Sequence, residues 1–376
     1  MSTKVILIRN AAATDFGGGE RVPVFIAKEL KKYNIDPIVF SGSIKLLDFA
    51  QSEGVAHKKT WWWPLQNWSG ARALLFPAYV VWQLILFFYY IGLFSGYRPK
   101  TVHIQSKDDF IAATFAARVL GIAVFWSDYA DLKHIWMNHR VWYKNPVGKF
   151  VYLAAYGATT IVAVSKEDRR LIAENIPDGT IKNKLEVIYN GTFDSYSLSP
   201  KAEQFTYIST SRLVVDKGIR ELILAFQQLV AIYPDIQLDL IGDGPDKDMF
   251  IDLAKDTLNI HFLGHQSQPL TYVARSHVFV LPTYHEGFSI ALVEACMEQT
   301  AIIATNIGGN PEIIVNETNG LLIAVKSVDQ LFTAMRRLYE DQPLAQKLAT
   351  AARERYVTDF NFSTIIKNQF LPLYNK

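Results

Sequence analysis

The stretch Val278-Phe-Val-Leu-Pro-Thr-Tyr-His-Glu-Gly-Phe-Ser-Ile-Ala-Leu-Val-Glu-Ala295 contains the patterns of a strand, a loop and a helix in succession. The apolar run 278–281 predicts a buried strand, and the run 290–297 predicts a helix that is apolar except for Glu294. A strand that passes directly into a helix is the repeating unit of parallel α/β sheets. This stretch therefore predicts an α/β fold.

Two acidic residues mark the loop and the helix of this stretch, Glu286 beside Gly287 and Glu294. An ionised carboxylate buried in an apolar helix without a partner costs on the order of several kcal/mol, so Glu294 is expected to bind something polar. A ligand hydroxyl is one candidate. The alternative is a surface acid at Glu286 and a core Glu294 paired with a lysine or arginine, and the two glutamates alone favour that alternative.

The residues between the two acids, Gly287, Phe288 and Ser289, are expected to form the first turn of the helix. Backbone N–H groups in a first turn have no partner within the helix, and the helix dipole favours an anion there. The segment thus predicts a phosphate site between two carboxylates.

Strand-like runs alternate with helical patterns along the whole chain, which predicts parallel sheets with helices on both faces. The polar stretch 190–204, which contains Pro200, is the expected joint between two doubly wound, Rossmann-like domains. Such domains bind ligands at the carboxyl ends of their strands, in the cleft between them. The strands are expected at residues 4–8, 37–41, 102–104, 123–127, 161–164, 185–188, 205–210, 237–241, 260–263, 278–281, 301–305 and 321–324.

Length and composition fit a soluble enzyme of two domains. The 376 residues exceed the size at which one core usually divides, and 50% of them are hydrophobic. A net charge of +2 without a long basic run argues against nucleic acid as a partner. The single cysteine, Cys296, excludes an internal disulfide and fits a reducing compartment. The apolar run 5–8 is too short for a signal-peptide core, so the chain is expected to be cytoplasmic.

Charged and glycine-rich loops follow the strands expected in the second half. Arg212 and Lys217 follow the strand 205–210, and two fixed cations there suit a diphosphate. Tight turns follow two further strands, at Gly242-Asp-Gly-Pro245 and Gly308-Gly-Asn-Pro-Glu312, and allow close approach of the backbone. Each loop alone is a weak signal, but all of them are expected on one side of one sheet.

Short motifs in a fixed order run through the second half: Ser211-Arg-Leu-Val-Val-Asp-Lys-Gly218, Gly242-Asp-Gly-Pro245, Phe262-Leu-Gly264, Leu281-Pro282, Glu286-Gly-Phe-Ser289 with Glu294-Ala295, Gly308-Gly-Asn-Pro-Glu312 and Asn319-Gly320. With these motifs, residues 205–324 resemble the donor-binding domain of family 4 retaining glycosyltransferases (group 1 glycosyltransferases) with the GT-B fold. The first half resembles the family more loosely, through Gly17-Gly-Gly-Glu-Arg21, Val164-Ser-Lys166 and Tyr189-Asn-Gly191. The resemblance implies an acceptor-binding domain over 1–192, a nucleotide-sugar-binding domain over 193–357 and a helix over 358–376 that returns to the first domain.

The resemblance also implies how the donor is held. In such enzymes a nucleotide sugar binds the second domain, and the leaving diphosphate gains charge as the glycosidic bond breaks. Arg212 and Lys217, with the backbone N–H groups of 287–289, would neutralise that charge without a metal. Glu294 would bind the ribose hydroxyls, and Glu286 would face the donor sugar near its reacting carbon. Neither a cofactor nor a metal site is expected, because no His or Asp cluster has convincing ligand spacing.

Gly242 is expected to let the backbone of the second domain approach the donor in the cleft. Gly17, Gly18 and Gly19 are expected to let acceptor and donor phosphates approach the backbone of the first domain. Ser289 stands where many relatives carry glycine. That difference leaves the backbone N–H groups unchanged.

The acceptor side is predicted from residues of the first half. Asp128 follows the strand 123–127, at the place where relatives often carry a histidine. It could orient or deprotonate the acceptor hydroxyl, or it could cap a helix. His103 and Gln105, at the end of the preceding strand, are expected to point to the cleft. For His103, a hydrogen-bonded structural role at the strand end is favoured over catalysis.

The segment from Trp61 to Tyr97 is unusually apolar. It contains Trp61-Trp-Trp-Pro-Leu-Gln-Asn-Trp68, and residues 73–97 carry no charge. A helix from Pro77 would be about 27 Å long, close to the thickness of a bilayer core. A single crossing is disfavoured, because it would put strands of one domain on opposite sides of the membrane. The alternatives are a fully buried helix and a monotopic patch rimmed by Trp and Tyr, and the four tryptophans favour the patch.

The expected function is that of a retaining glycosyltransferase that moves a sugar from a nucleotide sugar to a hydroxyl acceptor. The acceptor is expected to be a saccharide, linked to a lipid of an envelope or capsule pathway, met on the inner face of the membrane through peripheral contact by residues 61–97. One alternative is a nucleotide-sugar epimerase of the same architecture. Another is a catalytically silent nucleotide-binding subunit, against which the two glutamates argue together with Arg212 and Lys217.

Overall fold

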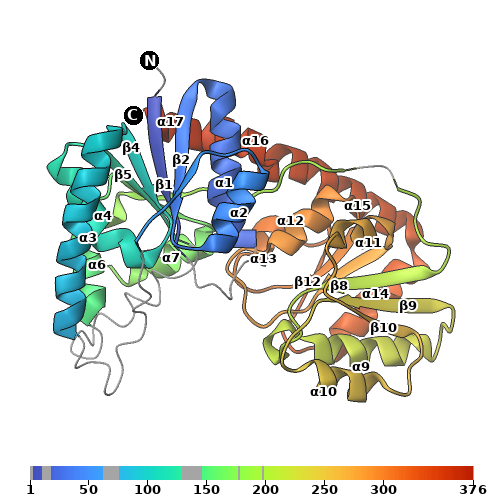
Figure 1. Cartoon of the computed structure of the whole chain (residues 1–376). Helices are drawn as coiled ribbons and strands as arrows, with labels where there is room; N and C mark the ends of the chain where they lie inside the picture. Colours follow the sequence, from blue (N-terminus) through green and yellow to red (C-terminus); the bar gives the residue numbers. More distant parts are fainter. Residues whose placement is uncertain are drawn as a thin grey trace. The chain divides into compact units, whose positions relative to one another are not determined.

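The computed structural model describes residues 3–10, 18–61, 76–128, 146–176, 178–196 and 199–375. The chain divides into two compact units, one of residues 1–188 with 366–376 and the other of residues 189–365. The sequence placed these divisions at 192/193 and 357/358. Each unit is built on its own parallel sheet, covered by helices (Figure 1).

The first unit has a seven-stranded sheet in the order β3-β2-β1-β4-β5-β6-β7, and every neighbouring pair is parallel. The sequence did not predict β3, because its three residues are polar and pair only with β2 at the sheet edge. The other strands were predicted, with ends that differ by one or two residues. The strands are β1 (Thr3–Ile8), β2 (Ile35–Ser41), β3 (His57–Lys59), β4 (Thr101–Ile104), β5 (Ala123–Asp128), β6 (Thr160–Ala163) and β7 (Leu185–Val187).

Helices connect these strands, and the last residues of the chain add two more helical segments to the same unit. Among them, α3, α4 and α6 lie side by side on one face of the sheet (Figure 1). The helices are α1 (Gly18–Leu30), α2 (Ile44–Ser52), α3 (Phe76–Tyr97), α4 (Phe110–Val119), α6 (Pro146–Ala155), α7 (Lys166–Glu174), α8 (Gly179–Lys182), η7 (Ile366–Phe370) and α17 (Leu371–Asn375), with short turns η1 (Lys31–Tyr33) and η3 (Lys107–Asp109).

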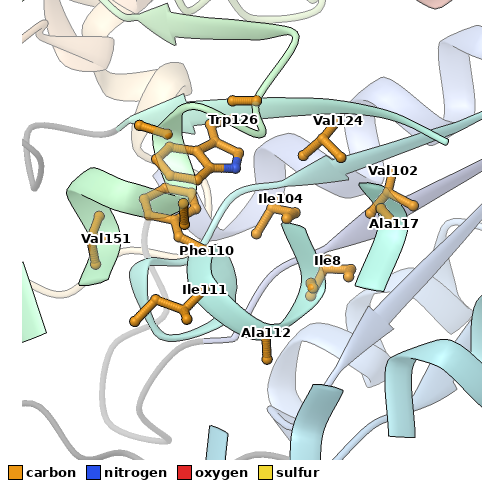
Figure 2. Packing of buried hydrophobic residues seen from close by; sticks show 14 of the residues in the cluster. Ile8, Val102, Ile104, Phe110, Ile111, Ala112, Ala117, Val124, Trp126 and Val151 are labelled. Atoms are coloured by element: carbon orange, nitrogen blue, oxygen red, sulfur yellow. The ribbon is translucent and has the colours of Figure 1, made fainter. Parts of the chain in front are cut away.

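The core of the first unit lies between the sheet and the layer of α3, α4 and α6. The rings of Phe110 and Trp126 stack with centroids 4.2 Å apart, and Val151 of α6 lies beside them (Figure 2). The Trp126 indole donates a 2.9 Å hydrogen bond to the Thr114 hydroxyl, so its polar group is satisfied inside the core. Packing of α4 on β5 through these side chains fixes the helix layer to the sheet.

Helix α3 is long and apolar enough, by length and composition, to cross a membrane, but only 22% of its most apolar window is buried. Its buried residues Tyr79, Leu86, Tyr90 and Phe94 form one stripe along the helix. The strands β3 and β4 on either side of it belong to one sheet. This arrangement agrees with the expectation that α3 is a helix within a domain. Because one face of α3 is exposed, the alternative of a fully buried helix does not apply.

The second unit has a six-stranded parallel sheet in the order β10-β9-β8-β11-β12-β13. All of its strands were predicted. The order changes direction between β8 and β11, and the loops that follow those two strands are therefore neighbours at the carboxyl edge, where doubly wound sheets bind ligands. The strands are β8 (Phe205–Thr210), β9 (Ile236–Ile241), β10 (Ile260–Gly264), β11 (Val278–Leu281), β12 (Ala301–Thr305) and β13 (Leu321–Ile323).

The helices of the second unit alternate with its strands. They are η5 (Val215–Lys217), α9 (Ile219–Val230), α10 (Lys247–Ala254), α11 (Pro269–Arg275), α12 (Ile290–Met297), α13 (Asn310–Ile313), α14 (Val328–Glu340), α15 (Gln342–Arg355), η6 (Tyr356–Phe360) and α16 (Phe362–Ile365). The core between the sheet and α9 and α14 is closed by large side chains such as Tyr207 and Phe226.

Candidate active site

Lys217 and Glu286 form an ion pair where the sheet order of the second unit reverses. The Lys217 Nζ lies 3.0 Å from Glu286 Oε2, and the two side chains are 16% and 18% exposed. Lys217 ends the short turn η5 after β8, and Glu286 lies in the loop after β11. Two residues that the sequence predicted at separate strand ends are thus in contact. The pair presents one cation and one anion at the edge of the sheet.

Backbone contacts hold the two loops together. The Tyr284 N–H donates to the Asp216 carbonyl oxygen at 2.7 Å. Gly218, with a left-handed φ of 68°, lies so close to Pro282 that a Cβ on it would overlap the Pro282 carbonyl oxygen. A Cβ on Gly308 would likewise overlap the carbonyl oxygen of Glu286. The glycines are required here because three strand-end loops meet backbone to backbone.

Tyr284 links the Glu286 loop to helix α9, and no sequence motif predicts this link. Its hydroxyl donates a 2.5 Å hydrogen bond to Oε2 of Glu221, which lies in the first turn of α9 and is 6% exposed. Burial, and then the hydrogen bond to Glu221, raise the pKa of Tyr284 above its usual range. The ammonium of Lys326 lies 4.8 Å from the centre of the Tyr284 ring. Because α9 begins directly after Lys217 and Gly218, Tyr284 helps to position both members of the ion pair.

Helix α12 begins at Ile290, which corrects the expectation that Gly287, Phe288 and Ser289 form its first turn. Ser289 has extended backbone angles and caps the helix, and its hydroxyl accepts a hydrogen bond from the Leu292 N–H at 3.3 Å. Serine is a strong helix-capping residue for this reason. Gly287 and Phe288 therefore lie in the loop before the cap, next to Glu286.

The Phe288 side chain is buried and contributes to packing. Its ring stacks on Tyr189 with centroids 5.2 Å apart and meets Phe360 edge-on at 5.8 Å. The Tyr189 hydroxyl donates a 3.0 Å hydrogen bond to Glu312, in the motif that follows β12. Phe288 can therefore offer a ligand only its backbone, while its ring fixes the loop that carries Glu286.

Glu294 is half-buried on α12, whereas its neighbours Val293 and Ala295 are buried. The helix thus turns this carboxylate toward its more accessible side. Cys296 on the same helix is buried, and burial raises the pKa of its thiol to about 12. The thiol therefore stays protonated, in line with a packing role.

Arg212 and Gly242 lie at the carboxyl ends of β8 and β9. Arg212 is exposed, and no salt bridge among the described residues includes its guanidinium. Gly242 has a φ of 139°, and a Cβ there would overlap the carbonyl oxygen of Ser211. Because Gly242 has no side chain, the loop that carries Arg212 can pack directly against the end of β9. Within the described ranges, no three His, Cys, Asp or Glu side chains are grouped as a metal site would need.

The residues predicted in the first half lie in the first unit. Gly17 lies outside the described residues, and Gly18 and Gly19 open helix α1. Asp128 is the last residue of β5 and pairs in register with Ala163 of β6. Asp128 thus lies at the carboxyl edge of the first sheet.

His103 is fully buried, which agrees with the structural alternative and not with contact to an acceptor. Its Nδ1 lies 2.6 Å from the hydroxyl oxygen of Tyr374, and its Nε2 lies 2.7 Å from that of Ser127. Burial lowers its pKa to about 3, so the ring is neutral near pH 7. The strand turns His103 toward the face covered by η7 and α17, where the Phe370 ring lies at 5.8 Å. Its contacts are those of the structural alternative.

Comparison with known proteins assigns the chain to a family. The model for "Glycosyltransferase Family 4" matches residues 16–193, and the model for "Glycosyl transferases group 1" matches residues 193–355. The two matches meet at residue 193 and cover both sheets. The chain is a family 4, group 1 glycosyltransferase.

Individual relatives of this glycosyltransferase are distant. It is 30% identical to a glycogen synthase of Mycobacterium tuberculosis over 171 residues, which are 44% of this chain and 41% of the relative. It is 27% identical to the capsular polysaccharide biosynthesis glycosyltransferase CapM of Staphylococcus aureus over 244 residues, 59% of this chain and 63% of CapM. The chain thus spans less than two thirds of these curated relatives.

The fold of the glycosyltransferase is shared with solved structures over the whole chain. Anabaena HepE, solved in complex with UDP-glucose, superposes with a TM-score of 0.76 at 18% identity, covering 99% of this chain and 100% of HepE. With the two parallel sheets, this confirms the predicted GT-B fold.

Proposed function

We propose that this glycosyltransferase moves a sugar from a nucleoside diphosphate sugar to a hydroxyl acceptor, with retention of configuration at the reacting carbon and without a metal ion. The Lys217–Glu286 ion pair at the reversal point of the second sheet carries the proposal. A site that holds a cation and an anion 3.0 Å apart suits a substrate with a charged diphosphate and a neutral sugar. The complex of HepE with UDP-glucose, a protein of the same fold, supports this class of donor.

In the proposed reaction, positively charged side chains lie where the leaving diphosphate gains negative charge. As the bond between sugar and diphosphate breaks, negative charge grows on the leaving oxygen. The Arg212 guanidinium, which no described side chain pairs, binds two diphosphate oxygens as a planar fork, and the Lys217 ammonium approaches from the adjacent loop. Donors of this kind, fixed before the reaction, stabilise the transition state more than the ground state.

The two glutamates have separate roles in this proposal. Glu294, on the accessible side of α12, accepts hydrogen bonds from the vicinal ribose hydroxyls. Glu286 faces the sugar near its reacting carbon, and the Lys217 ammonium holds its side chain in position. Asp128, at the carboxyl edge of the first sheet, orients or deprotonates the acceptor hydroxyl.

The proposed acceptor is a lipid-linked saccharide of envelope polysaccharide or glycolipid synthesis. Helix α3 leaves Val81, Leu84 and Phe88 exposed, at 56%, 56% and 69%. An uncharged helix with such a face suits peripheral contact with a membrane, here its cytoplasmic side. The match to CapM, which is named for capsular polysaccharide synthesis, supports the same class of acceptor.

Ligand-detected NMR with uridine, guanosine and adenosine diphosphate sugars tests the donor site. One donor is expected to bind the wild type but not Glu294→Ala. The control Glu354→Ala, which removes an exposed carboxylate from α15, should bind that donor as the wild type does. Absence of binding to every donor by the wild type would contradict the proposal. With the donor known, the anomeric configuration of the product and its formation in the presence of EDTA test retention and metal independence. Interconversion of the donor without any acceptor would instead indicate an epimerase.

A further inference from the structure

The helix layer of α3, α4 and α6 has an unusual distribution of charge. α3 contains no charged residue, α4 contains only Arg118, and α6 contains only Lys149. The layer therefore carries two cations and no acid. Both cations are exposed, and each directly precedes an exposed apolar residue, Val119 and Phe150. Cations beside exposed apolar side chains are typical of surfaces that bind anionic lipid.

A groove of about 410 Å³ runs between these three helices. Its walls are almost entirely apolar, and they include Val80, Leu84 and Phe87 of α3, Phe115 and Val119 of α4, and Phe150 of α6. Four of these side chains, Leu84, Phe115, Val119 and Phe150, are also exposed to solvent. The groove is thus an open apolar channel on the surface of the unit.

The two polar side chains that line the groove are already hydrogen-bonded. Tyr79 and Gln83 are bonded to each other. The Gln83 amide also donates to the Asp108 carbonyl oxygen at 3.4 Å and accepts from the Ala112 N–H at 3.2 Å. A sugar or a peptide backbone in the groove would leave its own polar groups unsatisfied, which is unfavourable. A hydrocarbon chain has no such groups.

We propose that the groove between α3, α4 and α6 binds one acyl chain of an anionic membrane phospholipid. The chain lies along Leu84, Phe87 and Phe115, and the phosphate of its headgroup pairs with Arg118 or Lys149. This inference rests on the membrane contact proposed above and extends it from one helix to a defined lipid site. A flat apolar face would only rest on the bilayer, whereas this groove takes up a single chain and sets the orientation of the unit on the membrane.

Photo-crosslinking tests the occupant of the groove. The full chain is mixed with vesicles of phosphatidylcholine and phosphatidylglycerol in which a fraction of the acyl chains carries a diazirine. The label is expected on residues of α3 and α4. Leu84→Trp fills the groove but keeps the apolar surface, so it is expected to lose most of the label while it still binds the vesicles. Leu258→Trp, at an 88% exposed leucine of the second unit, is the matched control and should keep the label. Unchanged labelling of Leu84→Trp, or label outside this layer, overturns the proposal.

Vesicle sedimentation tests the face and its charges. Leu84→Glu should weaken binding about tenfold or more, since burial of a leucine side chain contributes on that order, and Leu258→Glu should not. Arg118→Gln and Lys149→Gln should each weaken binding to vesicles with phosphatidylglycerol about fivefold, and should leave weak binding to pure phosphatidylcholine unchanged. Equal affinity of wild type and Leu84→Glu overturns the proposal.

Two further measurements separate this inference from its rivals. Sedimentation velocity without lipid would reveal a dimer that Leu84→Glu dissociates if a second copy fills the groove, and that result overturns the lipid assignment. Labelling by a lipid-linked saccharide but not by phospholipid also overturns it. Nucleotide-sugar binding by the same variants should equal that of the wild type. If the wild type neither binds the vesicles nor takes up the label but still binds its donor, the lipid site alone is refuted. If the wild type is labelled but binds no donor, the proposed function alone is refuted.

Discussion

One helix layer of the first unit and the helix layers of the second are built alike but differ in surface chemistry. In the second unit, α9, α10 and α14 carry acidic and basic residues together, and some pair along a helix, as Arg336 does with Glu340 at 2.9 Å. In the first unit, α3, α4 and α6 carry two cations, and apolar residues fill their outer side. A doubly wound sheet needs apolar residues only on the inner side of its helices. The outer side of the first layer therefore serves something other than folding.

The polar side chains of the candidate site, in contrast, lie in the second unit. The second unit brings Lys217, Glu286 and Tyr284 together at its carboxyl edge. In the first unit, His103, for which contact with the acceptor was one of two expected roles, is a core residue. We conclude that the second unit is specialised at its sheet edge and the first at its outer helix layer. The following variants test this division.

The largest effect is expected for Lys217→Ala, which should lower turnover about a hundredfold, as for removal of one preorganised charge in other active sites. Initial rates at saturating donor measure it. Lys149→Ala in the first unit should leave turnover with a water-soluble acceptor unchanged. Near-normal turnover of Lys217→Ala would contradict the proposal that Lys217, at the sheet edge of the second unit, stabilises the diphosphate.

His103 should make the first unit sensitive to acid. Its pKa is about 3 in the folded chain and about 6.5 when unfolded, so the unfolded state binds the proton first as the pH falls. The stability from neutral His103 is fully present above pH 6.5 and is lost as the pH falls toward 3, at about 1.4 kcal/mol per pH unit. His103→Gln should flatten this dependence in thermal unfolding between pH 6.5 and 4, whereas His261→Gln, at an exposed histidine, should not. An unchanged slope in His103→Gln would show that the ring is not buried as described.

Buried Asp109 acts in the opposite direction and must be considered in the same titration. Burial raises its pKa to about 6, although hydrogen bonds from Ser106, Tyr90 and Asn10 oppose the shift. A raised carboxyl pKa contributes stability at low pH and loses it as the pH rises through about 6. The comparison of His103→Gln with wild type cancels this contribution, since both carry Asp109.

A smaller effect is expected for Tyr284→Phe, which removes the hydrogen bond to Glu221. Turnover should fall about fivefold with little change in donor KM, because one hydrogen bond to a charged group contributes about 1 kcal/mol or more to the position of the loop. The matched control is Tyr233→Phe, which removes an equally short 2.5 Å bond to Glu340 on the outer layer of the same unit. Equal losses of activity in the two variants would show that Tyr284 acts only through stability.

The smallest effect on stability is expected for Phe88→Ser in the first unit. The side chain is 69% exposed, so the free energy of unfolding should change by no more than about 0.5 kcal/mol. Vesicle binding should nevertheless fall severalfold. Ile251→Ser, at a 40% exposed residue of α10, should change neither quantity. Marked destabilisation by Phe88→Ser would mean that the outer face of α3 is covered by the protein itself.

The second unit was easier to predict than the first, for physical reasons. Its strands are continuous apolar runs, and its strand-end loops carry Arg212, Lys217 and Glu286 in recognisable order. β3 was missed because an edge strand of three polar residues has no apolar signal. The alternation of a strand does not tell which face a helix from the far end of the chain will cover, so two roles stayed open for His103, with the structural one favoured. Tyr284 was missed because its role depends on a hydrogen bond to Glu221, which lies 63 positions away in the sequence.

The bond between His103 and Tyr374 joins residues 271 positions apart in the chain. During synthesis, the strands of the first sheet leave the ribosome before any residue of the second unit, but Phe370 and Tyr374 leave after all of it. The first unit therefore cannot complete its core before residues 366–375, which follow the whole second unit in the chain, have been made. A chain cut after residue 365 would contain the whole second unit but would lack η7 and α17 of the first.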